Sequence, residues 1–197
     1  MTTTERELTW EETHRQKRWG TCPEPMMARF VKRRLKEKAL VVDLGCAIGA
    51  NAFWLLDEGY GVYALDIAPA ALLQLYDRRP DARRIQARVG DVAAIPWPPG
   101  TFDGIVDVCC LQHVMDPMPA LQDVHRVLKR DGWFFSMTAS HRHAPEAMSG
   151  HRARFVTETN VRKLYQAAGF AVRALETAEH SDRGLTIAHY CLECTKA

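Results

Sequence analysis

The amino-acid sequence predicts an α/β fold in which one mostly parallel sheet carries helices on both faces. The first observation is an apolar run at residues 40–44 that ends in a glycine turn and is followed by a helical pattern from Ala50. The second is an apolar run at residues 62–65 that ends in an acid, Asp66. Strand, glycine turn, helix, strand and acid form the sequence pattern of a nucleotide-binding βαβ unit.

The composition is that of an ordinary globular domain. The chain has 197 residues, of which 47% are hydrophobic and 25% charged, and its formal net charge is +2. This charge gives no strong bias towards nucleic acid or a membrane surface. The N-terminal residues are polar and no apolar run approaches the roughly 18 residues of a membrane span. Several of the six cysteines lie in strand-like runs, which is typical of reduced buried thiols, so we expect a cytoplasmic protein.

The glycine turn differs from the dinucleotide-binding fingerprint. It reads D-x-G-x-A-x-G, from Asp43 through Gly45 and Ala47 to Gly49. An acid two residues before the first glycine repels a pyrophosphate and suits a ligand that carries a positive charge. Asp66, at the end of the next strand, can accept hydrogen bonds from both hydroxyls of a ribose. A nucleoside with a cationic group meets both requirements.

Four motifs in order resemble the class I S-adenosylmethionine (SAM)-dependent methyltransferases. They are Asp43-Leu44-Gly45-Cys46-Ala47-Ile48-Gly49, Leu65-Asp66-Ile67-Ala68, Gly90-Asp91-Val92 and Phe102-Asp103-Gly104-Ile105-Val106. The resemblance implies SAM as cofactor, with S-adenosylhomocysteine as product. It also implies a Rossmann-like sandwich whose seven-stranded, mostly parallel sheet has an antiparallel last strand. Ala47 stands where many members have glycine, so we expect a tighter pocket there.

The resemblance also implies a set of cofactor-binding residues. Asp91 would meet the adenine amino group, although the same residue could instead cap a helix. The backbone after the strand at residues 102–110 would touch the methionine part of SAM, which places Val108 and Cys109 near the sulfur. The expected set is Trp19, Asp43, Gly45, Cys46, Ala47, Gly49, Asp66, Ile67, Asp91, Val92, Val108 and Cys109.

The chain is divided at residue 38 into an N-terminal helical segment, 1–38, and a SAM-binding domain, 39–197, within one domain overall. In the family such a segment often lies over the cofactor as a lid. Two interpretations of its large side chains remain open, because they would either wall the methyl-transfer site or pin the helix to the sheet. These side chains are Trp10, Trp19, Met26, Met27 and Phe30.

Three histidines are the candidate catalytic residues. His113 follows the strand at residues 102–110 and could act as a general base, or be structural. His141 and His143 lie in the irregular segment 138–157, which could bind an acidic substrate, deprotonate a nucleophile or be a solvated loop. No metal site is expected, because Cys191-x-x-Cys194 is a single pair in a strand-like run, whose side chains face opposite sides.

The expected acceptor is a small molecule with an oxygen, nitrogen or sulfur nucleophile. Residues 107–110 lack the proline–proline–aromatic motif with which nucleic-acid amino methyltransferases of this fold hold a flipped base. Nucleic acid and membrane are therefore not expected as partners. Two alternatives stay open: a SAM-binding enzyme with non-methylating chemistry, and a non-catalytic subunit that depends on a partner chain. The acceptor itself and the oligomeric state have no signature in the sequence.

Overall fold

The computed structural model describes residues 9–16, 22–143, 151, 153–182 and 185–197. Its elements, in chain order, are α1 (Trp10–Gln16), α2 (Pro25–Arg34), β1 (Leu40–Leu44), α3 (Ala50–Asp57), β2 (Gly61–Asp66), α4 (Pro69–Arg78), η1 (Pro80–Arg84), β3 (Gln86–Val89), β4 (Phe102–Val108), η2 (Leu111–His113), α5 (Pro117–Val127), β5 (Leu128–Ala139), α6 (Glu158–Ala167), β6 (Phe170–Asp182) and β7 (Leu185–Lys196). The two η elements are single 3-10 turns.

The strands form one sheet of the predicted type. Its order is β3-β2-β1-β4-β5-β7-β6. Among the described strands, β7 alone runs in the opposite direction to the other six, so its pairings with β5 and β6 are antiparallel and the other pairings are parallel. The fold class expected from the sequence, a Rossmann-like sandwich with an antiparallel last strand, is therefore confirmed. The chain leaves β1 towards β2 on one side and later returns to β4 on the other. Crevices at such a reversal, outside the carboxyl ends of the strands, are where open α/β sheets bind ligands.

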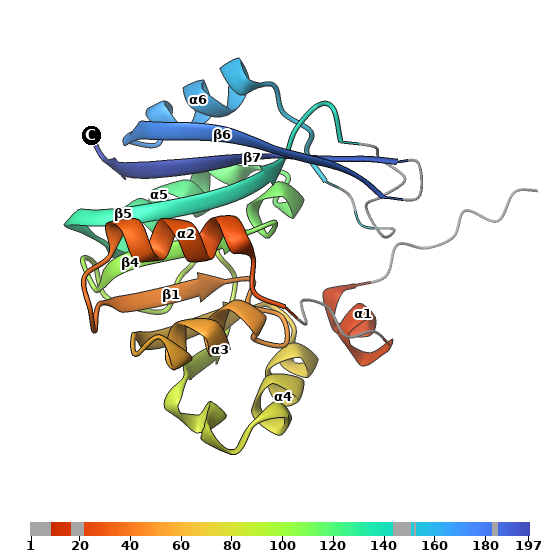
Figure 1. Cartoon of the computed structure of the whole chain (residues 1–197), viewed down its shortest axis with the longest axis vertical. Coiled ribbons are helices and arrows are strands. Elements are labelled where there is room, and N and C mark those ends of the chain that lie inside the picture. Colours follow the sequence, from red (N-terminus) through yellow and green to blue (C-terminus); the bar gives the residue numbers. More distant parts are fainter. Residues whose placement is uncertain (1–8, 17–21, 144–150, 152, 183–184) are drawn as a thin grey trace, which may run out of the picture.

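Helices cover both faces of the sheet (Figure 1). On one face, α2, α3 and α4 pack against apolar side chains that include Val41 and Phe135. On the other, α5 and α6 pack against a second cluster that includes Val42 and Phe134. Neighbouring residues of one strand thus enter different clusters, because side chains alternate across a sheet. The central strands are buried on both faces, which explains why they read as continuous apolar runs.

Strand β7 separates the two cysteines of the Cys191-x-x-Cys194 pair. Cys191 packs in the cluster under α2 and α3, whereas Cys194 packs in the cluster under α5 and α6. The two thiols therefore lie on opposite faces of β7, as the strand period predicts.

Strand β5 passes through a dipeptide that favours a turn. Helix α5 ends at Val127, and β5 begins at Leu128 and continues through Asp131 and Gly132, although Asp-Gly is a common turn sequence. The register of β5 against β4 shifts between Phe102, which pairs with Leu128, and Gly104, which pairs with Trp133, so three extra residues of β5 are absorbed as an irregularity in the ladder. Tertiary pairing has overridden a local turn signal.

Two arginines at the end of α2 pair with a buried acid of β7. Arg33 and Arg34 both contact the carboxylate of Glu193, which is 5% exposed, and the Arg34 guanidinium lies over the Trp133 ring. Because a buried carboxylate needs a partner, these contacts fix α2 across the strands of the sheet. No helix in the described part of the chain is both long and apolar enough to span a bilayer.

The aromatic core under α6 makes a direct test of the packing. Phe134 is fully buried and its ring stacks on Tyr165 with centroids 5.9 Å apart. Phe134→Ala should lower the free energy of unfolding by about 3–5 kcal/mol, because it removes buried apolar surface and leaves a cavity. Urea denaturation measures this loss. Leu73→Ala, at a side chain that is 67% exposed, is the control and should change stability by less than about 0.5 kcal/mol.

Candidate active site

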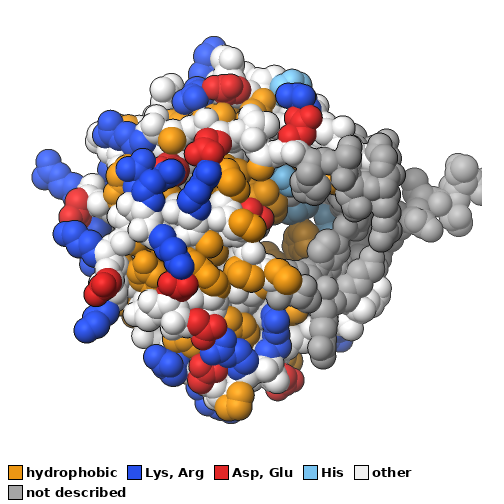
Figure 2. Space-filling view, viewed as in Figure 1, with side chains coloured by type: hydrophobic (Ala, Val, Ile, Leu, Met, Phe, Trp, Pro, Cys, Tyr) orange, Lys and Arg blue, Asp and Glu red, His pale blue; other side chains and the backbone are white. Residues whose placement is uncertain are grey.

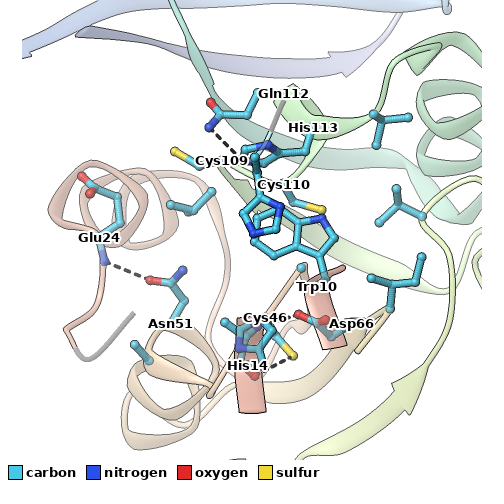
Figure 3. Close-up of a pocket in the computed structure, with 18 of the residues that line it drawn as sticks. Trp10, His14, Glu24, Cys46, Asn51, Asp66, Cys109, Cys110, Gln112 and His113 are labelled. Atoms are coloured by element: carbon cyan, nitrogen blue, oxygen red, sulfur yellow. Dashed lines mark hydrogen bonds between the residues drawn. The ribbon is translucent and has the colours of Figure 1, made fainter. Parts of the chain in front are cut away.

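A cavity of about 730 Å³ opens at the carboxyl ends of β1, β2 and β4. Figure 2 shows a hollow bordered by histidine and apolar side chains, and Figure 3 shows the residues that line it. The lining residues are Trp10, His14, Cys22, Glu24, Gly45, Cys46, Ala47, Ala50, Asn51, Asp66, Ile67, Gly90, Asp91, Val92, Val108, Cys109, Cys110, Gln112, His113, Val114, His143, His151, Ile187 and His189. The volume is within the range of about 300–1,000 Å³ typical of small-molecule and cofactor sites.

Asp66 holds the glycine turn in shape. One of its oxygens accepts the N–H of Ala47 over 2.8 Å, and the other accepts the N–H of Ala68 over 2.9 Å. Gly45 and Ala47 both have positive φ, +64° and +48°. A positive φ is strained for alanine. The hydrogen bond from the N–H of Ala47 to Asp66 offsets this strain, which explains how Ala47 can stand where many family members have glycine.

Asp43 lies buried beneath the turn rather than on the cavity wall. It is 1% exposed, and its Oδ2 has no hydrogen-bond partner among the described residues. Burial, and then the nearby Asp66 and Asp107, raise the pKa of Asp43 to about 8. An orphaned carboxylate oxygen at a site crowded with acids is stabilised when a cation binds close by. This observation fits a cofactor that carries an ammonium and a sulfonium.

Asp107 is a functional residue whose role the sequence reasoning missed. Its carboxylate accepts the N–H groups of Cys110 and Leu111 over 2.9 and 3.1 Å, and the hydroxyl of Ser136 over 2.6 Å. Burial raises its pKa to about 6. The hydrogen bonds stop β4 and turn the backbone at Cys109, where φ is +62°. The signal in the sequence was an acid inside an otherwise apolar strand, which is costly unless it accepts hydrogen bonds.

The cysteines beside the turn form a neutral wall. Burial raises the pKa of Cys46, Cys109 and Cys110 well above the ordinary thiol value, and the nearby acids add to this effect. A thiol is nucleophilic only as the thiolate. These three side chains therefore bound the cavity as small, neutral groups and do not supply a nucleophile at neutral pH.

The opposite wall of the cofactor half carries Ile67, Asp91 and Val92. Ile67 is 54% exposed, which is unusual for a large apolar side chain and suits contact with a flat ring. Asp91 accepts the N–H of Ala93 over 2.8 Å, so it caps the local turn. Its second oxygen leaves the expected adenine contact possible, since a carboxylate accepts several hydrogen bonds.

The large side chains of the N-terminal segment divide between the cavity and the core. Trp10 of α1 lies across the opening between His113 and Asp66 (Figure 3) and stacks on His151 with ring centroids 3.8 Å apart. Met27 and Phe30 are buried under α2 against the sheet and do not line the cavity. Met26 is half-buried against the same cluster. Trp19 lies outside the described residues.

Hydrogen bonds hold helix α1 against α4. The Glu11 carboxylate accepts the N–H of Ala70 over 2.8 Å, and the Gln74 side chain contacts the carbonyl of His14. His14 is 3% exposed and its imidazole faces the cavity, where burial lowers its pKa despite the nearby Asp66. His14 had no distinctive pattern in the sequence, and only this docking of α1 brings it to the site.

The three candidate histidines are not brought together. His113 and His143 line the cavity, but His141 does not, and its Nδ1 lies 3.3 Å from the Tyr190 hydroxyl. Gly49 also lies off the cavity wall, where it caps α3 at a φ of +84°. The structure adds cavity residues that the sequence did not single out, chiefly Glu24, Asn51, Gln112, Ile187 and His189. They come from elements distant in sequence, so spacing could not reveal them.

A family profile described as a methyltransferase domain matches residues 42–136. Among curated relatives, the rat mitochondrial arginine-hydroxylase NDUFAF5 is 27% identical, over 86% of this chain and 57% of its own length. The bovine 18S rRNA (guanine-N(7))-methyltransferase is 36% identical, over 36% of this chain and 25% of its own. The chain thus spans little more than half, or less, of the length of these relatives.

Solved structures share the fold. A methyltransferase in complex with the Haloferax volcanii Trm112 methyltransferase activator superposes with a TM-score of 0.75 and 18% identity, over 94% of this chain and 93% of that chain. The Burkholderia thailandensis 1,6-didemethyltoxoflavin-N1-methyltransferase, with its substrate and S-adenosylhomocysteine bound, gives a TM-score of 0.74 and 22% identity, over 95% of this chain and 84% of that chain.

Residues 42–136 match a methyltransferase domain, and the fold and the cavity are those expected of a class I SAM-dependent methyltransferase. The family expected from the sequence is confirmed, and with it the family's cofactor, SAM, which the orphaned oxygen of Asp43 and the Asp66 turn fit. The expectation that excluded nucleic acid as a partner was wrong. Relatives include rRNA methyltransferases, and a structural neighbour is bound to a protein activator, so a missing motif in one strand does not decide the partner.

Gly45 can be tested against a matched glycine. A Cβ at Gly45 would lie 2.5 Å from Cβ and 2.6 Å from Sγ of Cys110, whereas a Cβ at Gly59 would meet no described atom within 4 Å. Both glycines have positive φ, so both alanine variants should lose about 1–2 kcal/mol of stability. Only Gly45→Ala should also lose at least about tenfold in SAM affinity by calorimetry, because the turn must move. Equal affinities for the two variants would contradict this.

SAM affinity should rise with pH between about 6 and 8. Asp43, with a pKa near 8, is mostly protonated below this value, and a bound cation favours its ionised form. Binding below pH 8 therefore releases a proton, and the affinity gain ends once Asp43 is ionised in the free protein.

Calorimetry in buffers of different ionisation enthalpy measures this proton release. Asp43→Asn should abolish it, whereas Asp57→Asn, at an exposed ion pair with Arg79, should leave it unchanged. A proton release that persists in Asp43→Asn would assign the titration to another group.

Proposed function

We propose that this chain is an enzyme that transfers a methyl group from SAM to an acceptor bound in the same cavity. The observation that carries the proposal is the continuity of that cavity. The Asp66 turn and the imidazoles of His113, His143 and His189 line the same cavity. A cofactor and an acceptor held in one cavity can be aligned for in-line transfer. Orientation of this kind can contribute about 7–11 kcal/mol to catalysis.

The cofactor half has a group for each part of the cofactor. Each oxygen of Asp66 already accepts one backbone N–H and retains a lone pair for a ribose hydroxyl. Ile67 and Val92 offer apolar contact to the adenine, and the backbone held by Asp107 borders the methionine side. When bound, SAM supplies an electrophilic methyl group on a sulfonium. The chain's own tasks are then to orient the acceptor, exclude water and take up a proton where the nucleophile carries one.

His113 is the candidate base in this proposal. Its Nε2 lies 3.3 Å from the side-chain nitrogen of Gln112, whose oxygen accepts the N–H of Ala139 over 2.7 Å. Since that oxygen is occupied as an acceptor, the amide nitrogen donates to His113. This contact orients the ring of His113 at the cavity wall and uses the Nε2 lone pair, so His113 acts as a base only when an acceptor displaces the Gln112 amide from Nε2.

The acceptor proposed here carries an oxygen, nitrogen or sulfur nucleophile and includes RNA bases among the candidates. The printed name of the bovine relative supports testing RNA beside small molecules. A cytoplasmic location is also part of the proposal, and the six free cysteines support it.

Two observations favour alternatives that the same experiments separate. The rat relative is named as a hydroxylase, so chemistry other than methylation is a second candidate. A structural neighbour is bound to an activator protein, so dependence on a partner chain is another. Turnover of an acceptor without methyl transfer would support the first. Methyl transfer only after addition of a partner would support the second.

Thermal unfolding is the first test of the proposed cofactor. SAM or S-adenosylhomocysteine at about 100 times its dissociation constant should stabilise the fold by roughly 2.7 kcal/mol, whereas NAD should not. Asp66→Ala should abolish the shift, because it removes the ribose acceptor and the support of Ala47. Asp57→Asn should retain it. The acceptor screen follows with radiolabelled SAM, small molecules and ribosomal RNA. No shift with either cofactor form would contradict the proposal.

A further inference from the structure

Two carboxamide side chains, Asn51 and Gln112, are among the described residues that line the cavity. The amide nitrogen of Gln112 contacts the ring of His113, so that donor is already in use. Asn51 is the second residue of α3 and lies two positions after Gly49, the last glycine of the turn. Neither the fold nor the candidate base accounts for its amide.

A backbone contact fixes the direction in which the Asn51 amide faces. The N–H of Glu24, the residue before α2, donates to Oδ1 of Asn51 over 2.9 Å. A backbone N–H can only donate, so the atom that receives it is the amide oxygen and not the nitrogen. Glu24 is itself held in place, because its carboxylate accepts the N–H of Met26 over 3.0 Å at the start of α2.

The Nδ2 group of Asn51 is available to a ligand. It has no hydrogen-bond partner among the described residues, and it is not one of the buried side-chain atoms that lack a partner, so it is accessible. Figure 3 shows the amide oxygen directed to Glu24 and the nitrogen directed to the cavity. An amide nitrogen carries two N–H donors. Asn51 can therefore donate to a carboxylate in the cavity.

The position of Asn51 along the cavity indicates which part of the cofactor it would meet. In the proposed function, Asp66 accepts the ribose hydroxyls. Figure 3 shows Asn51 and Glu24 on the opposite side of Cys46 from Asp66. SAM is an extended molecule with adenosine at one end and an α-amino acid at the other. With the ribose at Asp66, the amino-acid end reaches the side of the cavity that holds Asn51.

The charges of the cavity suit an amino acid better than a simple anion. No lysine or arginine is among the described lining residues, and the acids there are Glu24, Asp66 and Asp91. These acids attract an ammonium and a sulfonium but repel an isolated anion. The carboxylate of the same amino acid still needs donors. A neutral amide supplies them without a positive charge that would repel the sulfonium, and the peptide dipoles of the first turn of α3 favour an anion there.

We infer that Nδ2 of Asn51 binds the carboxylate at the amino-acid end of the cofactor, and that the backbone N–H of Glu24 holds the amide in the orientation this requires. The inference rests on the proposed function and adds a binding residue to the same site. It also gives the N-terminal segment a part in cofactor binding, because Glu24 belongs to that segment and Asn51 to the domain that follows it.

Asn51→Asp separates recognition from folding. An aspartate keeps an oxygen for the Glu24 N–H but replaces the Nδ2 donors with a negatively charged oxygen. Without ligand, the variant should therefore unfold at the same temperature as the wild type. S-adenosylhomocysteine should bind it at least about tenfold more weakly in calorimetry, because two carboxylates would then face each other.

A ligand without the carboxylate is the matched probe. Decarboxylated S-adenosylhomocysteine keeps the adenosine, the sulfur and the ammonium. Asn51→Asp should bind this ligand as tightly as the wild type does, or more tightly, because the added negative charge attracts the ammonium. Weakening of both ligands by the same factor, or an unchanged affinity for S-adenosylhomocysteine, would overturn the inference.

Asn51→Ala is the second variant, because it removes the donors without adding a charge. It should weaken S-adenosylhomocysteine by about three- to tenfold and leave the affinity for the decarboxylated ligand unchanged. This variant decides the question if Asn51→Asp does not fold. Asn160→Asp makes the same charge change at an exposed residue of α6 that does not line the cavity, so it should alter neither affinity.

The wild-type protein distinguishes failure of this inference from failure of the proposed function. If wild type does not bind S-adenosylhomocysteine, the proposed function is overturned. If wild type binds it and both Asn51 variants bind it equally well, only the role of Asn51 is overturned.

Discussion

Three buried carboxyl groups at one edge of the sheet are the constraint on which the site depends. Asp43, Asp66 and Asp107 lie at the ends of β1, β2 and β4, and each is at most 6% exposed. Burial, together with the two neighbouring acids, raises the pKa of Asp43, and burial raises that of Asp107, so buried acids at this edge need hydrogen-bond donors. Asp66 and Asp107 find them in backbone N–H groups, and the resulting bonds shape the glycine turn and the end of β4. One oxygen of Asp43 has no partner among the described residues, and a cation nearby would stabilise its ionised form.

The cavity therefore has two chemically distinct halves. The half at the turn is acidic and suits a cationic nucleoside. Imidazole and indole rings from distant segments line the rest of the cavity. Hydrogen bonds hold two of these rings, since Gln112 contacts Nε2 of His113 and the backbone of Ala188 contacts Nδ1 of His143.

Much of the fold and the cofactor half could be predicted from the sequence. The apolar runs, the turn between Asp43 and Gly49 and the acid at Asp66 are local patterns, and parallel strands place their ends together. The order of the elements then determined the sheet and the family. Local sequence patterns do not predict the structure where strand pairing determines it, as in the extension of β5 through Asp131 and Gly132. The prediction that excluded nucleic acid as a partner also failed, because the absence of one motif does not exclude binding through other surfaces.

The sequence by itself determined the βαβ unit, the acidic cofactor edge and the class of protein, because each depends on residues close together in the chain. Only the tertiary structure decided the acceptor half. Thr13 meets His151 across 138 residues, and Ala188 meets His143 across 45. No sequence spacing predicts such contacts, because the packing of α1 on α4 and the pairing of β5 with β7 create them. Which histidines enter the cavity follows from those contacts alone.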